Sequence, residues 1–324
     1  LTHRANRGRM QTFLFLPEQS IILRKGIVVN KQVAARPRDG FTTGLGVIFA
    51  TLGSAIGLGN IWKFPSLTGL NGGAAFLILY LACTLLVGLP VMISELSLGR
   101  RARANAVTTF EKLAPRQPWW LIGAGGALAA FLILAFYTEV AAWVIAYIFK
   151  AAFGQLSSVD PQVTAAAFSG LISSPVQSLL WQWLVLAMIA AIIIAGVSKG
   201  IERMTKRLVP ALFVLLLIVI VRSLTLPGAS EGLVFLFRPD FSKVTWATVL
   251  VAMGLSFFKL SVGMGTMITY GSYFREDQNI PGTAARVMLG DVLVSILAGI
   301  AIFPAVFAFG FEPDAGPSLL FITI

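Results

Sequence analysis

Seven long hydrophobic stretches, separated by short polar segments, dominate the sequence. They run over about 41–67, 74–98, 119–149, 178–197, 208–226, 245–273 and 284–311. Each is long enough to cross the roughly 30 Å hydrocarbon core of a bilayer as a helix. The pattern therefore predicts seven membrane-spanning helices in one transmembrane domain at 37–324, preceded by a basic tail at 1–36.

Lysine and arginine residues are distributed unevenly between alternate loops. The tail to residue 40 and the loops after the second, fourth and sixth stretches hold most of them. The loops at 69–74 and 151–176 hold none, and the loop at 227–244 holds only Arg238 and Lys243. Because cytoplasmic loops carry an excess of lysine and arginine, we expect a multi-pass protein of the inner (plasma) membrane with a cytoplasmic N-terminus.

Composition narrows the possible chemistry. The chain is 57% hydrophobic and 12% charged, with a net charge of +11. Membrane topology explains this positive charge, so the expected partner is the lipid bilayer and not a nucleic acid. The single cysteine, Cys83, and the single histidine, His3, exclude an internal disulfide, a histidine metal cluster and a histidine-based triad. With no nucleophile–base pair or metal set in the sequence, we expect no enzyme.

Two of the seven stretches are interrupted by glycine and polar residues. The interruptions consist of Gly53, Gly57, Gly59 and Asn60 in the first stretch, and of Gly254, Ser256, Lys259, Ser261, Gly263 and Gly265 in the sixth. Irregular backbone at membrane depth persists only where it is buried in protein or lines a cavity, and paired broken helices indicate a transporter's central binding site. Close helix packing is the alternative, but it explains Asn60 and Lys259 poorly.

Several motifs in order resemble the neurotransmitter:sodium symporter family, in its bacterial amino-acid transporter branch. They are GSAIGLGNIWKFP at 53–65, NGGAAF at 71–76, GLP at 88–90, ELSLGR at 95–100, FY at 136–137 with Trp143, GVSKGIE at 196–202 and ITYGSY at 268–273. The resemblance covers about 38–324 and implies an all-α membrane protein with the leucine-transporter fold. That fold has two inverted five-helix repeats, with helices one and six broken.

The resemblance also implies how the repeats divide the chain. The first repeat would occupy about 41–226, and the second would begin over about 245–311. Family members have about eleven or twelve spans, so we expect this sequence to be truncated after helix seven, with the C-terminal part missing. Those later helices would complete the second sodium site, the substrate pocket and the gates.

By this resemblance, the substrate carboxylate would meet backbone N–H groups near Leu58 and Gly59 and the hydroxyl of Tyr137. A helix N-terminus suits an anion because its N–H groups are unpaired. Gly57 stands where amine transporters of the family have an aspartate, which favours amino acids. The expected substrate-binding residues are Ala55, Leu58, Gly59, Ile133, Tyr137, Phe258, Ser261 and Met264. This largely apolar set implies a neutral, hydrophobic amino acid as the partner.

The family binds two sodium ions. The first site would use oxygens of Ala55 and Asn60 with the substrate carboxylate, but Lys259 and Asp291 occupy the two other ligand positions. A lysine and a sodium ion repel each other in one small site, so we expect Lys259 to supply the positive charge and pair with Asp291. A fixed structural ion pair is the alternative. The second site would use carbonyl groups of Gly53 and Ile56.

The family's chloride site is altered, and its gates are partly retained. Tyr80 and Ser295 match the chloride site, but Leu255 replaces the usual glutamine, so we expect no chloride requirement, with Asp291 as the fixed negative charge. The expected gate residues are Arg38 and Phe41 at the inner face and Lys63 at the outer face, and Glu95 is expected to brace the broken part of helix one. Glu139 has no family role that we can assign.

These features predict secondary active uptake of a neutral, hydrophobic amino acid, driven by a sodium gradient through alternating access. Two alternatives remain. Replacement of an ion ligand by Lys259 would also suit a sensor that binds an amino acid without transporting it. A lysine at this depth tends to lose its proton when unpaired, so Lys259 could also couple transport to protons. The sequence makes no prediction of oligomeric state.

Overall fold

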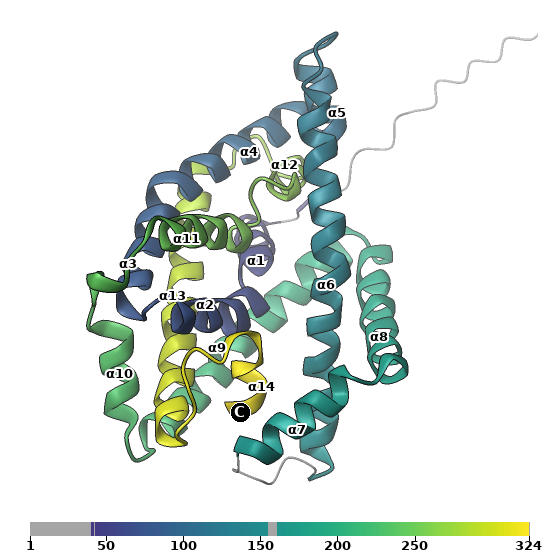
Figure 1. The fold of residues 1–324 in the computed structure, drawn as a ribbon. Coiled ribbons are helices and arrows are strands. Elements are labelled where there is room, and N and C mark those ends of the chain that lie inside the picture. The colour runs from purple at the N-terminus through teal and green to yellow at the C-terminus, as the bar shows by residue number, and fades with distance from the viewer. Residues whose placement is uncertain (1–39, 42, 155–160, 324) are drawn as a thin grey trace, which may run out of the picture. The chain divides into compact units, whose positions relative to one another are not determined.

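The computed structural model describes residues 40, 41, 43–154 and 161–323, which belong to one compact unit. Those residues form helices and connecting segments and no strands (Figure 1). The first hydrophobic stretch forms α1 (Gly44–Ala55), a π-helical segment (Gly59–Lys63) and α2 (Phe64–Leu70). The second forms α3 (Ala74–Cys83), a π-helical segment (Thr84–Gly88) and α4 (Leu89–Ala102).

The next three stretches form long helices. They are α6 (Trp120–Ala152), α8 (Pro175–Ile194) and α9 (Arg203–Leu224), the last preceded by a π-helical segment at Val197–Glu202. The sixth stretch is split into α11 (Trp246–Lys259) and α12 (Thr266–Gly271), and the seventh forms α13 (Ile280–Ala308). Shorter helices lie in the connections: α5 (Ala106–Leu113), α7 (Pro161–Ile172), α10 (Ala229–Phe237) and α14 (Leu319–Thr323). Two 3₁₀ turns, Phe241–Lys243 and Gly316–Ser318, complete the set.

Five continuous helices in the described part of the chain are long and apolar enough to cross a membrane. A sixth span comes from the first stretch, whose two halves are bent by 42° at the break. The stretch at 245–273 forms two short helices instead of one continuous span, as expected for a broken helix six. The seven stretches therefore fold as five continuous and two interrupted helices.

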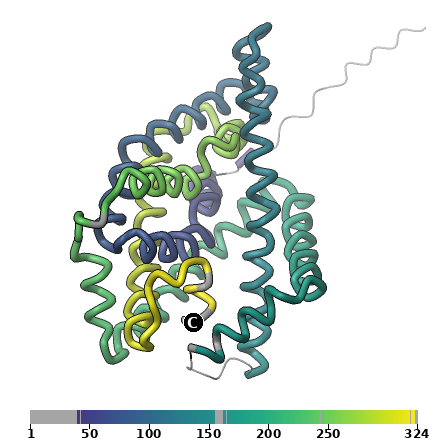
Figure 2. The backbone as a smooth tube through the Cα atoms, in the orientation of Figure 1, coloured from purple at the N-terminus to yellow at the C-terminus, as the bar shows by residue number. Residues whose placement is uncertain are grey.

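Both interruptions follow from the local sequence. Helix α1 ends where Ile56 adopts an extended conformation (φ −91°, ψ 121°), just before Gly57. After α11, the backbone turns left-handed at Ser261, Gly263 and Gly265, with φ of 54°, 79° and 72°. Glycine adopts such angles without steric penalty, so its repeated use here allows the chain to leave the helix and restart as α12. Figure 2 follows the backbone through both breaks.

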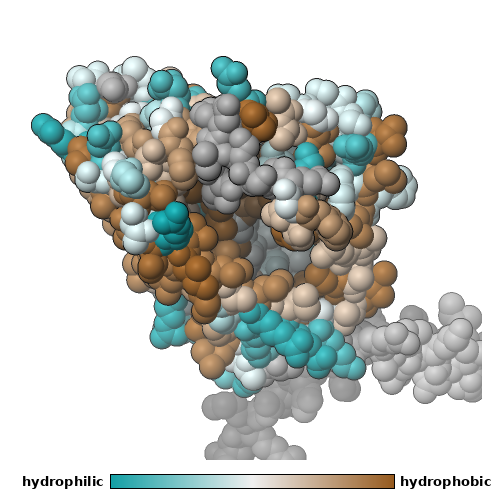
Figure 3. Space-filling view, turned by 90° about the horizontal axis from the view of Figure 1, so that it is seen from below, coloured by the Kyte–Doolittle hydropathy of each residue, from teal (hydrophilic) through white to brown (hydrophobic). Residues whose placement is uncertain are grey.

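Helix α13 lies at the centre of the packing, and most of its residues are buried. It contacts α1, α2, α4, α9 and α10, and so connects the first broken helix to the surrounding spans. By contrast, α6, α8 and α9 leave many large apolar side chains exposed, as suits contact with lipid. Seen from below, hydrophobic residues cover much of the surface and the molecule is hollowed near its centre (Figure 3).

Candidate functional site

A cavity of about 300 Å³ lies between the breaks of the two interrupted helices and one face of α6. All eight residues expected to bind substrate line it: Ala55, Leu58, Gly59, Ile133, Tyr137, Phe258, Ser261 and Met264. Gly53, Ile56 and Lys259 also contribute to its wall, together with Ser54 and Gly57. The cavity brings together residues that are more than 200 positions apart in the chain.

One end of the cavity presents hydrogen-bonding groups. The hydroxyl of Tyr137 accepts a hydrogen bond from the Gly59 N–H at 3.2 Å, and the Leu58 N–H also interacts with it. These N–H groups lie where the helix restarts, so they have no partner in a preceding turn. A Cβ on Gly57 would lie 3.5 Å from the same hydroxyl, so a larger side chain there would crowd this end. The arrangement offers N–H and O–H donors to a bound anion.

The remaining wall is apolar or weakly polar. The Phe258 ring lies edge-on to Tyr137, with ring centroids 5.9 Å apart, and Ile133 and Met264 complete the apolar surface. The Ser261 hydroxyl donates to the Ser54 carbonyl at 2.9 Å and so ties the two helix breaks together. The motifs did not single out Ser54 as a site residue, although its position inside the glycine-rich interruption was the available signal.

Glu95 contacts the break of helix six. Its Oε1 atom accepts a hydrogen bond of 2.6 Å from the Gly263 N–H, between α11 and α12. This contact arises because α4 packs against α12, so a carboxylate on α4 reaches N–H groups that the break leaves unpaired in helix six. The expected support of helix one by Glu95 stays a prediction.

Lys259 and Asp291 form a fully buried ion pair beside the cavity. The ammonium nitrogen of Lys259 lies 3.2 Å from Oδ2 of Asp291, and neither side chain is exposed. The ammonium also donates to the hydroxyl oxygens of Tyr80, at 2.9 Å, and of Ser295. The rings of Phe64 and Tyr80 lie 5.1 and 4.6 Å from it. An ammonium has three N–H donors, and here three oxygens accept from it.

Asn60 connects this pair to the break in helix one. Its Nδ2 donates to Oδ1 of Asp291 at 2.8 Å and to the hydroxyl of Ser295 at 3.2 Å. Its Oδ1 accepts from the Gly57 N–H at 3.2 Å. Tyr80 donates to the other carboxylate oxygen of Asp291 at 2.6 Å. Asn60, Asp291 and the Lys259 ammonium thus satisfy one another at the expected first sodium site, and this arrangement does not fit a sodium ion.

The backbone at the end of α1 is suited to a cation. The carbonyl groups of Gly53 and Ile56 accept no hydrogen bond from any residue that the structure describes. Carbonyl oxygens left unpaired at a helix end are hard donors of the kind that alkali and alkaline-earth cations prefer. Both residues also line a second hollow of about 380 Å³ against α9. This donor set fits the expected second sodium site.

The remaining expected residues lie around this centre. Leu255 is buried and apolar, and it belongs to the same hydrophobic cluster as Tyr80, one of the residues at the expected chloride position. Phe41 is buried, with its ring packed edge-on against Tyr273 and Phe274 near α12. The Lys63 ammonium lies 5.4 Å from the Trp62 ring.

Three parts of the sequence analysis remain: Arg38, the N-terminal tail and Glu139. The expected gate residue Arg38 and the tail at 1–36 lie outside the described residues. Glu139 accepts a hydrogen bond from the indole N–H of Trp143 at 2.8 Å, one turn further along α6.

Comparison with known proteins gives a consistent picture. The model of the sodium:neurotransmitter symporter family matches residues 38–163 and 170–314. The Bacillus subtilis protein YhdH, described as an uncharacterized sodium-dependent transporter, is 45% identical over 86% of this chain and 62% of its own length. A similarly described Haemophilus influenzae protein is 36% identical over 90% of this chain and 65% of its own length.

Among solved structures, the crystal structure of MhsT in complex with L-phenylalanine superposes with a TM-score of 0.85 at 48% identity. The match covers 89% of this chain and 65% of MhsT. The chain thus spans slightly less than two thirds of the length of these relatives. Since the family model matches most of the sequence and the fold agrees, the chain belongs to the sodium:neurotransmitter symporter family.

Proposed function

We propose that the protein containing this chain takes up a neutral, hydrophobic amino acid, driven by a sodium gradient, through alternating access. Family membership and the sodium-dependent relatives support the sodium-coupled part of this proposal. The MhsT structure, which contains L-phenylalanine, supports an amino acid as the substrate. Because the chain covers less than two thirds of these relatives, the activity is proposed for the whole protein.

The observation that carries the proposal is the cavity between the two helix breaks. It has N–H donors and the Tyr137 hydroxyl at one end. The rest of its wall is mostly apolar, apart from Ser54, Ser261 and the buried Lys259, and no carboxylate is among its described lining residues. The donors suit an α-carboxylate, and Gly57 leaves room for it. The apolar wall of Ile133, Phe258 and Met264 suits an uncharged side chain.

Sodium would act mainly at the second site. The Gly53 and Ile56 carbonyls would hold that ion, and it would stabilise the broken end of α1 by satisfying oxygen atoms that the helix leaves unpaired. At the first site, we propose that the Lys259 ammonium takes the place of the ion. The Asp291 carboxylate would then take the place of chloride, so uptake would not require chloride.

Uptake measurements with the full-length protein in sealed vesicles test this function. We expect L-phenylalanine and L-leucine to accumulate under an inward sodium gradient, and not when choline replaces sodium. 2-Phenylethylamine is the matched control, because it keeps the phenyl ring and lacks the carboxylate. Equal uptake of 2-phenylethylamine, or preferred uptake of L-glutamate or L-lysine, would contradict the proposal.

A non-transporting amino-acid sensor is the second candidate. The observation that favours it is the Lys259 ammonium at a position where the family binds a coupling ion. Flux and equilibrium binding measured on the same preparation separate the two functions. Sodium-dependent binding of L-phenylalanine without accumulation inside the vesicles would favour the sensor.

A further inference from the structure

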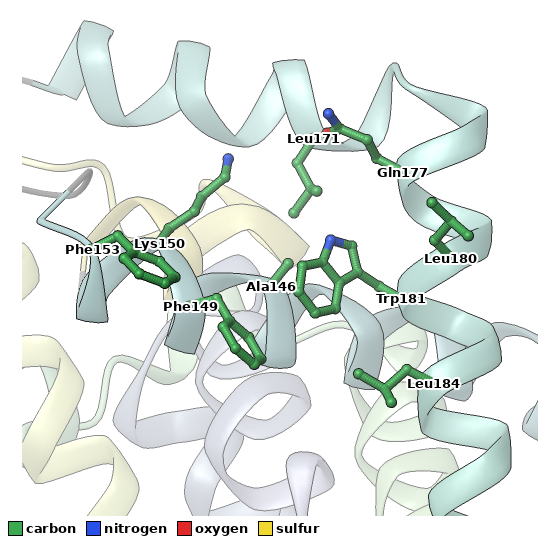
Figure 4. A pocket seen from close by; sticks show the side chains of 9 residues that line it. All are labelled: Ala146, Phe149, Lys150, Phe153, Leu171, Gln177, Leu180, Trp181 and Leu184. Carbon is green, nitrogen blue, oxygen red and sulfur yellow. The ribbon is translucent and has the colours of Figure 1, made fainter.

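A third cavity, of about 590 Å³, lies between the last turns of α6 and the first turns of α8, with α7 along one side (Figure 4). It shares no lining residue with the cavity at the helix breaks. The proposed transport cycle gives it no role. Its lining combines polar and apolar side chains in a way that indicates a particular class of ligand.

The length and composition of α6 and α8 indicate that the cavity lies near the membrane surface. Helix α6 has 33 residues and is therefore about 50 Å long, more than the roughly 30 Å hydrocarbon core. Lys150 lies in its last turn and Gln177 in the first turn of α8. Trp181 and the exposed Trp183 follow in α8, and tryptophan is enriched at headgroup depth. A ligand in this cavity would therefore contact both headgroups and acyl chains.

Three nitrogen-bearing side chains lie on the side of the cavity that faces α7. In Figure 4, the nitrogen atoms of Lys150, Gln177 and Trp181 all lie there. Lys150 donates to the Ala167 carbonyl at 3.2 Å, so its ammonium keeps two N–H donors for a ligand. No acidic side chain is among the described lining residues. This side is complementary to a negatively charged group.

The opposite wall is apolar. Phe149 and Leu184 lie on the side away from α7 in Figure 4. The Phe149 and Trp181 rings are in contact, with centroids 5.2 Å apart, and Leu180 is 67% exposed. Such a surface provides dispersion contacts for a hydrocarbon chain and no hydrogen-bonding partner for a soluble ion.

We propose that this cavity binds an anionic phospholipid. The phosphate contacts Lys150 and the neighbouring N–H donors of Gln177 and Trp181, and one acyl chain lies along Phe149 and Leu184. A zwitterionic lipid binds less well, because no carboxylate on this lining pairs with its ammonium. This binding does not depend on the transport activity proposed above, so each can fail without the other.

Quenching of Trp181 fluorescence by brominated lipids tests the site locally. The full-length protein in detergent is titrated with phosphatidylglycerol or phosphatidylcholine that carry the same brominated acyl chains. The part of the quenching that disappears in Trp181→Phe belongs to Trp181. We expect the Trp181 signal to be half quenched at a phosphatidylglycerol concentration about fivefold lower than the phosphatidylcholine concentration required. One lysine contributes about 1 kcal/mol to binding at an anionic lipid surface, which corresponds to this ratio.

Charge variants identify the cation responsible. Lys150→Met should abolish the difference between the two lipids, and Lys150→Arg should keep it. Lys199→Met is the matched control, because Lys199 is an exposed cation beyond the other end of α8 and its loss should change nothing. Lys150→Gln replaces Lys150→Met if the latter does not fold.

Three results would overturn the proposal. The first is equal quenching of wild-type Trp181 by both lipids. The second is an unchanged lipid preference in the Lys150 variants that lack charge. The third is displacement of the brominated phosphatidylglycerol by soluble glycerol 3-phosphate at similar concentration, which would indicate a phosphate site without a role for the acyl chain.

Discussion

The ammonium of Lys259 and the carboxylate of Asp291 have no exposed surface, so neither can be stabilised by water if the other is removed. Removing one member of such a pair destabilises the fold by much more than the intact pair stabilises it, because the remaining charge is buried without a partner. The hydroxyl oxygens of Tyr80 and Ser295 accept hydrogen bonds from the Lys259 ammonium, so they favour a cation at this position. The pair is therefore best tested by single and double substitution.

Lys259→Met should lower the free energy of unfolding by about 3–5 kcal/mol, because Asp291 becomes a buried, unpaired charge. The double variant Lys259→Met/Asp291→Asn should recover most of this loss. Thermal unfolding in detergent measures both. Arg275→Met is the control: Arg275 pairs with Asp277 at 3.0 Å on an exposed surface, and its loss should change the stability by less than about 1 kcal/mol. Equal effects of Lys259→Met and Arg275→Met would contradict the account.

The Tyr137 hydroxyl is the second test at this scale. Tyr137→Phe should weaken amino-acid binding about 5- to 30-fold, since it removes a hydrogen bond worth about 1–2 kcal/mol at the polar end of the cavity. Tyr147→Phe is a matched control on the same helix, because the Tyr147 hydroxyl is buried and has no hydrogen-bond partner among the described residues. Equilibrium binding of radiolabelled L-phenylalanine gives both affinities. Similar losses in the two variants would argue against a specific role for Tyr137.

Between elements, α4 and α12 approach each other closely, with glycine facing backbone on both sides. A Cβ on Gly99 would lie 1.9 Å from the Ile268 carbonyl oxygen, and one on Gly271 would lie 2.3 Å from that of Leu96. Both distances are too short for a non-bonded carbon–oxygen contact, so an added Cβ would clash at either position. The crossing positions α12, and with it the helix break that Glu95 supports.

Gly99→Ala should therefore force α4 and α12 apart and lower the midpoint of thermal unfolding. Gly125→Ala, in α6, should leave it unchanged or raise it slightly, because nothing lies within 4 Å of the added Cβ and alanine favours helix. Unfolding in detergent, followed by circular dichroism, compares the two variants. If Gly99→Ala is as stable as Gly125→Ala, the packing of α4 on α12 is not as close as described.

The sequence predicted the spans well and their ends less well. The fifth stretch was expected over about 208–226, but α9 begins at Arg203 after a π-helical segment. Hydropathy does not detect this first turn because Arg203, Lys206 and Arg207 are charged. The short helices α5, α7, α10 and α14 were not predicted, since they lie in connections with no membrane-length hydrophobic pattern.

The sequence predicted the site residues that motifs or the family resemblance indicate. It did not predict the contacts that depend only on tertiary packing. A short motif identified Tyr137, the family resemblance implied Phe258, and both residues line the cavity. The hydrogen bond of Glu95 to Gly263 joins residues 168 positions apart, so its partner depends on how α4 crosses α12. The contact of Lys259 in α11 with the Phe64 ring in α2 likewise arises only through tertiary packing.

For the whole molecule, the comparisons confirm the expected fold class and a multi-pass membrane protein, in a family of transporters rather than enzymes. The repeat boundaries, the site assignments and the cytoplasmic N-terminus stay predictions. We propose that a lysine–aspartate pair replaces one coupling ion, so that one sodium ion would accompany each amino acid. This proposal depends on the Lys259 network and on the unpaired carbonyls of Gly53 and Ile56.

The most direct test is the ratio of sodium to L-phenylalanine flux, measured with two isotopes in proteoliposomes of the full-length protein. The account predicts one sodium ion per amino acid in the wild type, with no effect of replacing chloride by gluconate. It predicts a second sodium ion in Lys259→Thr, where a hydroxyl replaces the ammonium beside Asp291. A ratio that is the same in both proteins, or a wild-type flux that requires chloride, would contradict it.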